Sequence, residues 1–276
     1  MANSQRGGLN STALALIPLA IAINIAGGQL VKVLKLPIYL DSIGTVLTGA
    51  LLGPWIGLVT GLLSNTIWTL IGLDQFALSF AAVAGIIGLL AGFAGRAGLF
   101  QRPSPRWLSA IIGGVFLFAL TLFVMLFINQ SVDADGNTVL PAAGDLFAQQ
   151  PIVFIVAILA GLAAGYFVLK NAGYAGLAGL VTGVVAAIVS APIAAYLFGG
   201  VTGAGTDALV AAFRASGASI IASAFAQGTV SDPFDKMTSF MIVYLIIQSL
   251  PRRLLQRFPN ARAAEAATLA RPAASR

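Results

Sequence analysis

A cluster of charged and aromatic residues interrupts the apolar N-terminal part of the chain and reads Lys32-x-x-Lys35-Leu-Pro37-x-Tyr39-x-Asp41. A charge at the centre of a bilayer costs about 2.5–3.5 kcal/mol, so these residues belong at an interface or beside a cavity. We predict that Lys35, Tyr39 and Asp41 contact a polar ligand in a pocket open to the outside, with the tyrosine ring available for stacking. The alternative is that the lysines extend to lipid headgroups and that Asp41 caps the next helix.

The second candidate is a glycine-rich segment, FGGVTGAGTD, over residues 198–207. Glycines at this density let the backbone turn tightly or approach a ligand closely. Thr202 and Asp207 would supply the polar contacts. No Gly-Lys-Ser/Thr follows, so the segment is not a nucleotide-binding P-loop. The alternative is a flexible hinge between two helices.

The third candidate is Asp232-Pro233-Phe234-Asp235-Lys236, which we expect at the start of the last helix. Asp235 and Lys236 would face the same ligand. The alternative is a helix N-cap with a surface ion pair.

Several polar residues also lie inside apolar runs. They could line a cavity or, alternatively, bond between helices, because polar groups in hydrocarbon need partners. These residues are Asn24, Gln29, Ser64, Asn65, Trp68, Tyr196 and Gln248. We include Asn65, Trp68 and Tyr196 among the predicted ligand contacts.

The residue types that the chain lacks exclude much chemistry. There is no Cys and no His, which removes disulfides, thiolates, imidazole bases and the common soft metal ligands. The only glutamate, Glu265, is near the C-terminus. We therefore predict no catalytic residues, no metal and no cofactor, and a protein that is not an enzyme.

The elements that must position these residues are membrane helices. Apolar residues make up 58% of the 276 residues and charged residues 9%, whereas about a quarter of a soluble domain is charged. We predict an all-α polytopic membrane protein, a single compact bundle of about six to eight transmembrane helices over residues 1–250. Hydropathy places eight spans at 12–31, 40–52, 55–72, 76–95, 107–128, 151–169, 175–198 and 236–250.

Charge predicts the orientation of this bundle. The tail over 251–276 is rich in arginine, so it belongs in the cytoplasm, and we expect it to be disordered. Counting back through the spans places both termini in the cytoplasm and every aspartate on the outside. Residues 206–228 are long enough to span, but a span there would put the tail outside. We therefore expect a re-entrant or interfacial outer helix near 206–228.

Small residues recur at four-residue spacing and predict close helix packing, because in lipid small residues let backbones approach. The stripes are Gly53-xxx-Gly57-xxx-Gly61, Gly88-xxx-Gly92, Gly161-xxx-Gly165 and Gly179-xxx-Gly183. Ala22-xxx-Ala26 in the first helix fits the same bundle or, alternatively, a face for a second subunit.

PIYLDSIGT over 37–45, with GPWIG over 53–57 and Ser64-Asn65, resembles the substrate-binding S component of energy-coupling factor (ECF) vitamin transporters. The resemblance implies a multi-pass protein of the bacterial cell membrane that captures a vitamin-like molecule from outside. It also implies a membrane coupling subunit and two cytoplasmic ATPases as partners. Ala22 and Ala26 match the family's Ala-xxx-Ala docking motif. The family has six spans, fewer than the eight counted here, and its metal-ion members use an N-terminal His that this chain lacks.

The leading hypothesis is therefore the substrate-specific subunit of an ECF-type importer driven by ATP. The alternative is a stand-alone channel or secondary transporter for a small solute. An ion-coupled carrier usually needs a carboxylate at mid-depth in the membrane, and the predicted spans place all aspartates near their outer ends.

Overall fold

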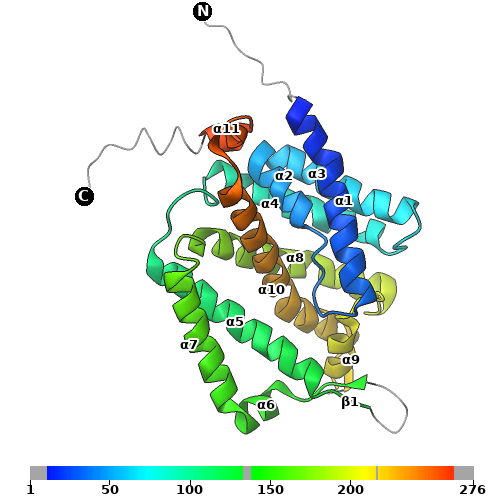
Figure 1. Cartoon of the computed structure of the whole chain (residues 1–276). Helices are drawn as coiled ribbons and strands as arrows, with labels where there is room; N and C mark the ends of the chain where they lie inside the picture. Colours follow the sequence, from blue (N-terminus) through cyan, green and yellow to red (C-terminus); the bar gives the residue numbers. More distant parts are fainter. Residues whose placement is uncertain (1–10, 133–137, 216, 264–276) are drawn as a thin grey trace, which may run out of the picture.

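The computed structural model describes residues 11–132, 138–215 and 217–263 and is built almost entirely of helices (Figure 1). In chain order they are α1 (Ser11–Val33), α2 (Ile43–Leu52), α3 (Pro54–Leu70), the 3-10 helix η1 (Ala77–Phe80), α4 (Ala81–Arg96), α5 (Arg106–Ile128), α6 (Ala143–Gln149), α7 (Pro151–Phe167), α8 (Gly173–Phe198), α9 (Asp207–Ala215), α10 (Ile220–Ser249) and α11 (Arg252–Leu255). In the described residues the only sheet is a short hairpin of β1 (Ser131–Val132) and β2 (Thr138–Val139). The prediction of an all-α bundle is confirmed.

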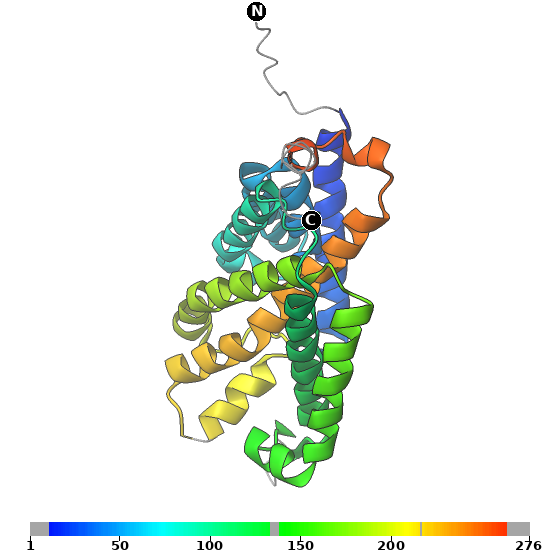
Figure 2. The ribbon, with the colours of Figure 1, turned by 90° about the vertical axis from the view of Figure 1, so that its left-hand side faces the viewer.

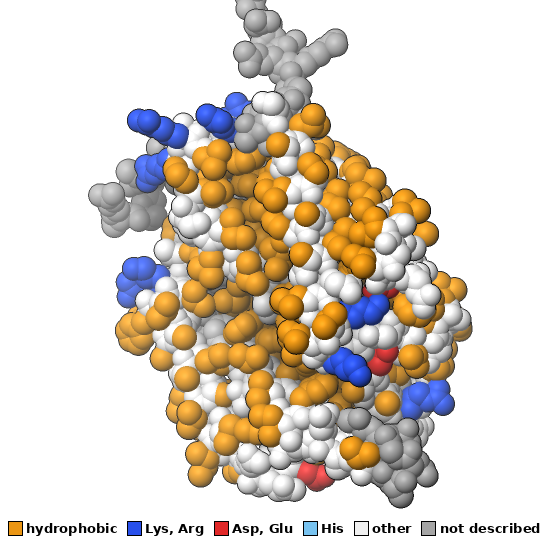
Figure 3. All heavy atoms as spheres, turned by 45° about the vertical axis from the view of Figure 1, so that its right-hand side comes forward, with side chains coloured by type: hydrophobic (Ala, Val, Ile, Leu, Met, Phe, Trp, Pro, Cys, Tyr) orange, Lys and Arg blue, Asp and Glu red, His pale blue; other side chains and the backbone are white. Residues whose placement is uncertain are grey.

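Four helical stretches are long and apolar enough to cross a membrane: Leu14–Val33, Ala77–Arg96, Arg106–Ile128 and Gly173–Phe198. The bent pair α6–α7 makes a fifth if it counts as one span. Apolar side chains cover much of the face seen in Figure 3, as expected for a surface that lipid solvates. These helices support the prediction of a membrane protein. They do not confirm six to eight spans, nor the positions of the termini.

The predicted span over 40–52 is wrong. α2 has ten residues and rises about 15 Å, half the thickness of the hydrocarbon core. Its sequence is as apolar as a span because nearly every residue in it is buried against other helices rather than exposed to lipid.

The helices form three groups, seen in Figures 1 and 2. α5 and α7 run side by side as a long pair, and α2, α3 and α4 pack together beside α1. α8 and α10 cross each other between these groups. α11 lies near the start of α1, at the opposite end of the molecule from the β-hairpin and α6. In Figure 3 some basic side chains lie toward the α11 end, where Arg252 and Arg253 are exposed, and others lie on the lower right-hand side.

α10 differs from the predicted last span over 236–250, because it begins much earlier in the chain. It runs unbroken for 30 residues from Ile220 to Ser249, so there is no single helix over 206–228. A turn at Gly217, with φ of 91°, separates α9 from α10, and the Ser219 side chain caps α10 by accepting from the Ala222 amide. The sequence predicts that residues 232–236 lie at the start of the last helix. In the structure they lie inside α10, where neighbouring helices can compensate for the missing N–H of Pro233.

Glycines bring the helix backbones into contact. A Cβ added to Gly88 of α4 would lie 2.1 Å from the carbonyl oxygen of Gly57 of α3, and one added to Gly161 would lie 2.3 Å from that of Gly113. Gly183 of α8 packs in the same way on the backbone at Pro233 of α10. The glycine stripes therefore act as helix-packing surfaces, as predicted.

The two ends of α2 are capped by asparagines from distant parts of the chain. Asn24 of α1 is fully buried; its Oδ1 accepts from the amide of Gly44 at 2.7 Å, and its Nδ2 donates to Thr45 and Ser64 at 2.7 and 2.8 Å. Asn260 donates to the carbonyl oxygens at 49 and 50. The predicted tail begins at residue 251, and the structure describes it as far as residue 263. This part includes the buried Asn260, which packs on the bundle. The rest of the tail lies outside the described residues.

We expect Asn24→Ala to lower the free energy of unfolding by about 1–3 kcal/mol, because it leaves buried amides at the start of α2 without an acceptor. Unfolding of the purified chain in detergent micelles measures this loss. Asn129→Ala, which removes an exposed asparagine at the end of α5, is the control and should change little. A stability equal to that of the unmodified protein would contradict the capping role.

Gly183→Ala should also destabilise the fold. The added Cβ would lie 2.3 Å from the Cα of Pro233, so α8 and α10 must separate, at a cost of about 1–3 kcal/mol. Gly144→Ala is the matched control, since nothing lies within 4 Å of its added Cβ and alanine favours a helix. The same detergent unfolding experiment compares the two; equal stabilities would show that the α8–α10 crossing tolerates a methyl group.

Candidate functional site

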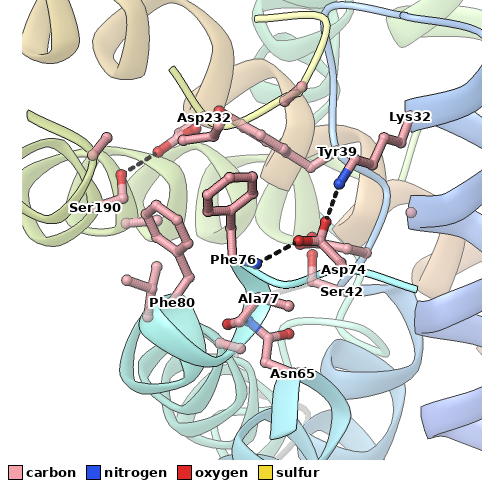
Figure 4. A pocket seen from close by; sticks show the side chains of 18 of the residues that line it. Lys32, Tyr39, Ser42, Asn65, Asp74, Phe76, Ala77, Phe80, Ser190 and Asp232 are labelled. Atoms are coloured by element: carbon pink, nitrogen blue, oxygen red, sulfur yellow. Dashed lines mark hydrogen bonds and ion pairs between the residues drawn. The ribbon is translucent and has the colours of Figure 1, made fainter. Parts of the chain in front are cut away.

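A pocket lies between α1, α3, η1, α4, α8 and α10, beneath the loops that follow α1, α3 and α8 (Figure 4). The empty space between its walls is about 1100 Å³, a figure that includes its open mouth. Because that figure includes open space, the side chains that line the pocket, rather than its volume, indicate what it could bind.

One wall of the pocket is apolar and aromatic. Phe76 and Phe80 project into it from the segment before α4, as Figure 4 shows. The ring of Phe198 supports the Phe76 ring edge-on, with centroids 4.9 Å apart. Asn65 of α3 donates to the carbonyl oxygen of Ala77 at 3.0 Å and so holds this segment in place. Trp68 lines the same pocket and packs on α1 at Gly28, where a Cβ would lie 2.2 Å from the indole.

Opposite the aromatic wall, α10 contributes a set of buried charges. Lys236 is 4% exposed and its Nζ donates to Asp41 at 3.3 Å, to Ser42 at 3.1 Å and to Asp235. The prediction that this segment sits at the mouth of the last helix, with a surface ion pair as the alternative, is wrong on both counts. Lys236 and its three partners meet inside the protein, since α10 begins 16 residues before Lys236 and this part of the helix is buried.

Asp235 also holds the loop that follows α1. Its Oδ1 accepts from the backbone amides of Tyr39 and Leu40 at 3.0 and 2.8 Å. Leu40 has φ of 49°, a left-handed conformation that costs a non-glycine residue energy and persists only where surrounding contacts enforce it. A carboxylate that accepts two consecutive amides is such a contact. Asp41 follows directly and turns toward Lys236 instead of capping α2.

Tyr39 joins this loop to the glycine-rich segment and to α10. Its hydroxyl lies 2.9 Å from the Thr206 hydroxyl, and Gln227 donates to it at 3.1 Å. Burial raises the pKa of Tyr39, and the charge of Asp232 raises it further, so the phenol stays neutral at physiological pH. The backbones of the two loops touch as well, because a Cβ on Gly205 would lie 2.3 Å from the carbonyl oxygen of Leu36.

Asp207 organises the glycine-rich segment. It accepts from the amide and hydroxyl of Thr202, with the closest bonds at 2.9 Å, and from the amide of Gly203 at 2.7 Å. Burial raises the pKa of Asp207 despite these bonds, which act in the opposite direction. Gly200 and Gly203 have φ of 81° and 75°, so the segment is a tight turn that only glycine accommodates without strain.

The sequence analysis missed a second ion pair at the mouth of the pocket. Lys32 Nζ lies 2.7 Å from Asp74 Oδ2, and Asp74 Oδ1 accepts from the Phe76 amide at 2.8 Å (Figure 4). The predicted topology already placed both residues on the outer side, which was the available signal. Ser190, Gln227 and Asp232 also line the pocket; the first two carry no sequence signal, since isolated Ser and Gln are common in helices.

The structure brings most of the predicted ligand contacts to one place. Those that line the pocket are Tyr39, Asp41, Asn65, Trp68, Thr202, Asp207 and Lys236. Asp235 is fully buried behind its wall. Lys35 is exposed with φ of 50°, and Tyr196 is 74% exposed on α8, so neither is brought to this pocket. Asn24 is satisfied between helices and is not among the lining residues.

Comparison with family models, curated proteins and solved structures finds no match. What the pocket does must therefore be argued from its own chemistry.

The buried ion pair gives a sharp prediction. Asp235→Asn keeps an oxygen for the amides of Tyr39 and Leu40 but leaves Asp41 as the one carboxylate in contact with Lys236, so we expect a loss of about 3 kcal/mol in the free energy of unfolding. The double variant Asp235→Asn/Lys236→Met, which also removes the buried cation, should recover part of this loss. Detergent unfolding measures both, with the exposed Asp145→Asn as control. A double variant less stable than Asp235→Asn would contradict charge compensation as the cause.

Proposed function

We propose that the chain is the substrate-binding subunit of an ECF-type importer, which captures a vitamin-like small molecule from outside for ATP-driven uptake by partner subunits. The observation that carries the proposal is the pocket: loops from three parts of the chain cover it, and polar and aromatic groups line it together. A site of this kind suits a ligand that is held tightly and then released by a change in the covering loops. A continuous conduit would not need such a cover.

The partner subunits would supply the energy, because no nucleotide-binding motif occurs in the chain. The small-residue stripe of α1 supports a docking role. Ala22 and Ala26 are exposed, whereas Ala20, Asn24 and Gly28 of the same helix are buried. α1 thus contributes to the bundle and the pocket with one face, and its exposed face carries Ala22 and Ala26 between the larger Leu19 and Leu30.

One observation favours a second candidate, an ion-coupled secondary transporter. The sequence-based objection was that no aspartate lies at mid-depth. Asp232 and Asp235 are buried in the middle of α10, and buried ionisable groups in membrane helices mark ion and proton pathways. Their burial favours this candidate, and an experiment must separate the two functions.

Mass spectrometry of small molecules released from the gently purified, detergent-solubilised chain should detect one stoichiometric compound. We then expect uptake of that compound by cells to require a membrane coupling subunit and ATPases that co-purify with the chain. Ala22→Leu and Ala26→Leu should retain the compound and lower its uptake at least tenfold, since a larger side chain blocks close helix approach. Ala160→Leu, on an exposed part of α7, is the matched control.

Uptake that follows an imposed proton or sodium gradient without any ATPase would contradict the importer and support the secondary transporter. Uptake that survives both α1 substitutions would move the docking face elsewhere.

A further inference from the structure

The charges of the pocket are not balanced. Four carboxylates line it, those of Asp41, Asp74, Asp207 and Asp232, and Asp235 behind the wall is a fifth. The only ammonium groups among the described residues that line it are those of Lys32 and Lys236. Lys32 is paired with Asp74, and Lys236 with Asp235 and Asp41. Within the described residues no other cation lines the pocket. The surplus charge is therefore negative.

Asp232 is where this surplus is most costly. It is 4% exposed, and among the described residues it takes part in no ion pair. Its contacts are hydroxyls: Ser190 donates to Oδ2 at 3.1 Å, and Ser231 approaches Oδ1 at 3.4 Å. The charge of Lys236 acts on Asp232, but the Lys236 ammonium group donates to Asp41, Ser42 and Asp235 instead. A buried carboxylate that no cation contacts directly is destabilised by several kcal/mol. A positive group on a ligand would offset that cost.

The surroundings of Asp232 favour an organic cation over an inorganic one. In the view of Figure 4 the rings of Phe76 and Phe80 lie between Asp232 above and Asn65 below. Cations already lie over two of its rings, Lys32 at 5.9 Å from the Phe76 centroid and Lys236 at 5.7 Å from that of Tyr39. Aromatic faces attract cations and stack on flat rings. No group of three or more acidic side chains in the described part of the chain is arranged to hold a metal ion.

A second, independent observation points to a ligand. Three buried side-chain atoms in the described residues lack a hydrogen-bond partner, the Oε1 of Gln29, the Nε1 of Trp68 and the Oγ of Ser223. Of these residues only Trp68, which is 5% exposed, lines the pocket. Buried indole N–H groups usually find an acceptor, and one on a bound molecule would complete this one.

We propose that the pocket selects a flat aromatic or heteroaromatic compound that carries a positive charge, with the charge placed at Asp232 and Ser190 and the ring among Phe76, Phe80 and Trp68. The inference rests on the proposed capture of a small molecule by this pocket. It names the chemical class of that molecule as cationic, whereas the sequence analysis predicted only that the ligand is polar.

Three commercially available probes of nearly equal shape test this directly. Benzamidine, benzamide and benzoate carry charges of +1, 0 and −1 at neutral pH on the same phenyl ring. Equilibrium dialysis of each against the purified full-length chain in detergent compares their affinities. We expect benzamidine to bind at least tenfold more tightly than either of the others. Equal binding of benzamidine and benzamide, or preference for benzoate, would overturn the proposal.

Asp232→Asn locates the effect. It removes the charge with little change in shape, and we expect the preference for benzamidine over benzamide to fall from tenfold or more to about one. Asp145→Asn, an exposed carboxylate on α6, is the control and should leave the preference unchanged. A preference that persists in Asp232→Asn would overturn the assignment to this residue. If that variant does not fold, the comparison of probes on the unmodified chain still decides the charge of the ligand.

Failure of this inference is distinct from failure of the transport role. A preference for benzoate would leave the coupling to ATPases untouched. Conversely, uptake driven by an ion gradient would leave the measured charge preference as it stands. Stabilisation of the protein by sodium ions, together with no preference for benzamidine, would assign Asp232 to an inorganic cation and overturn the proposal.

Discussion

The buried ammonium group of Lys236 is the constraint on which the arrangement of the pocket depends. A charge removed from water is tolerated only when oppositely charged and hydrogen-bonding groups surround it. Asp235 lies beside it on α10, but Asp41 and Ser42 come from the loop between α1 and α2. Neutralising Lys236 therefore fixes that loop against α10. The same loop then positions Tyr39, which ties the glycine-rich turn to both.

This network requires α10 to pass close to its neighbours, and glycines make the approach possible. Gly179 and Gly183 of α8 leave room for the α10 backbone from Asp232 to Met237. Ser190, about two turns beyond Gly183 along α8, then reaches Asp232. The Gly179–Gly183 stripe packs two helices together and thereby also determines where the Asp232 carboxylate lies in the pocket. Packing and site chemistry depend on the same small residues.

α2 illustrates how a membrane-like composition can arise without a span. Its residues are apolar because the bundle surrounds them. Water therefore cannot reach the backbone N–H and C=O groups at the ends of the helix, which have no partner within it. Asn24 and Asn260 supply the hydrogen bonds that water would otherwise provide. Because Asn260 follows α11, part of the arginine-rich C-terminal region is tied to the buried helix α2. The pocket loop that begins at the end of α1 and the C-terminal region are therefore attached to opposite ends of one short helix.

Composition and spacing alone determined the helical bundle, its apolar exterior, its glycine contacts and the segments that supply most of the pocket. They did so because hydropathy and small-residue periodicity are local properties of the chain. The course of α10, the capping of α2 and the partners of Lys236 were decided by the tertiary structure. Pro233 and the charges around it look like a helix start until the glycines of α8 and the carboxylate of Asp41 are placed beside them. The negative surplus at Asp232 is likewise invisible in the sequence, because it depends on which lysines are already paired with other carboxylates.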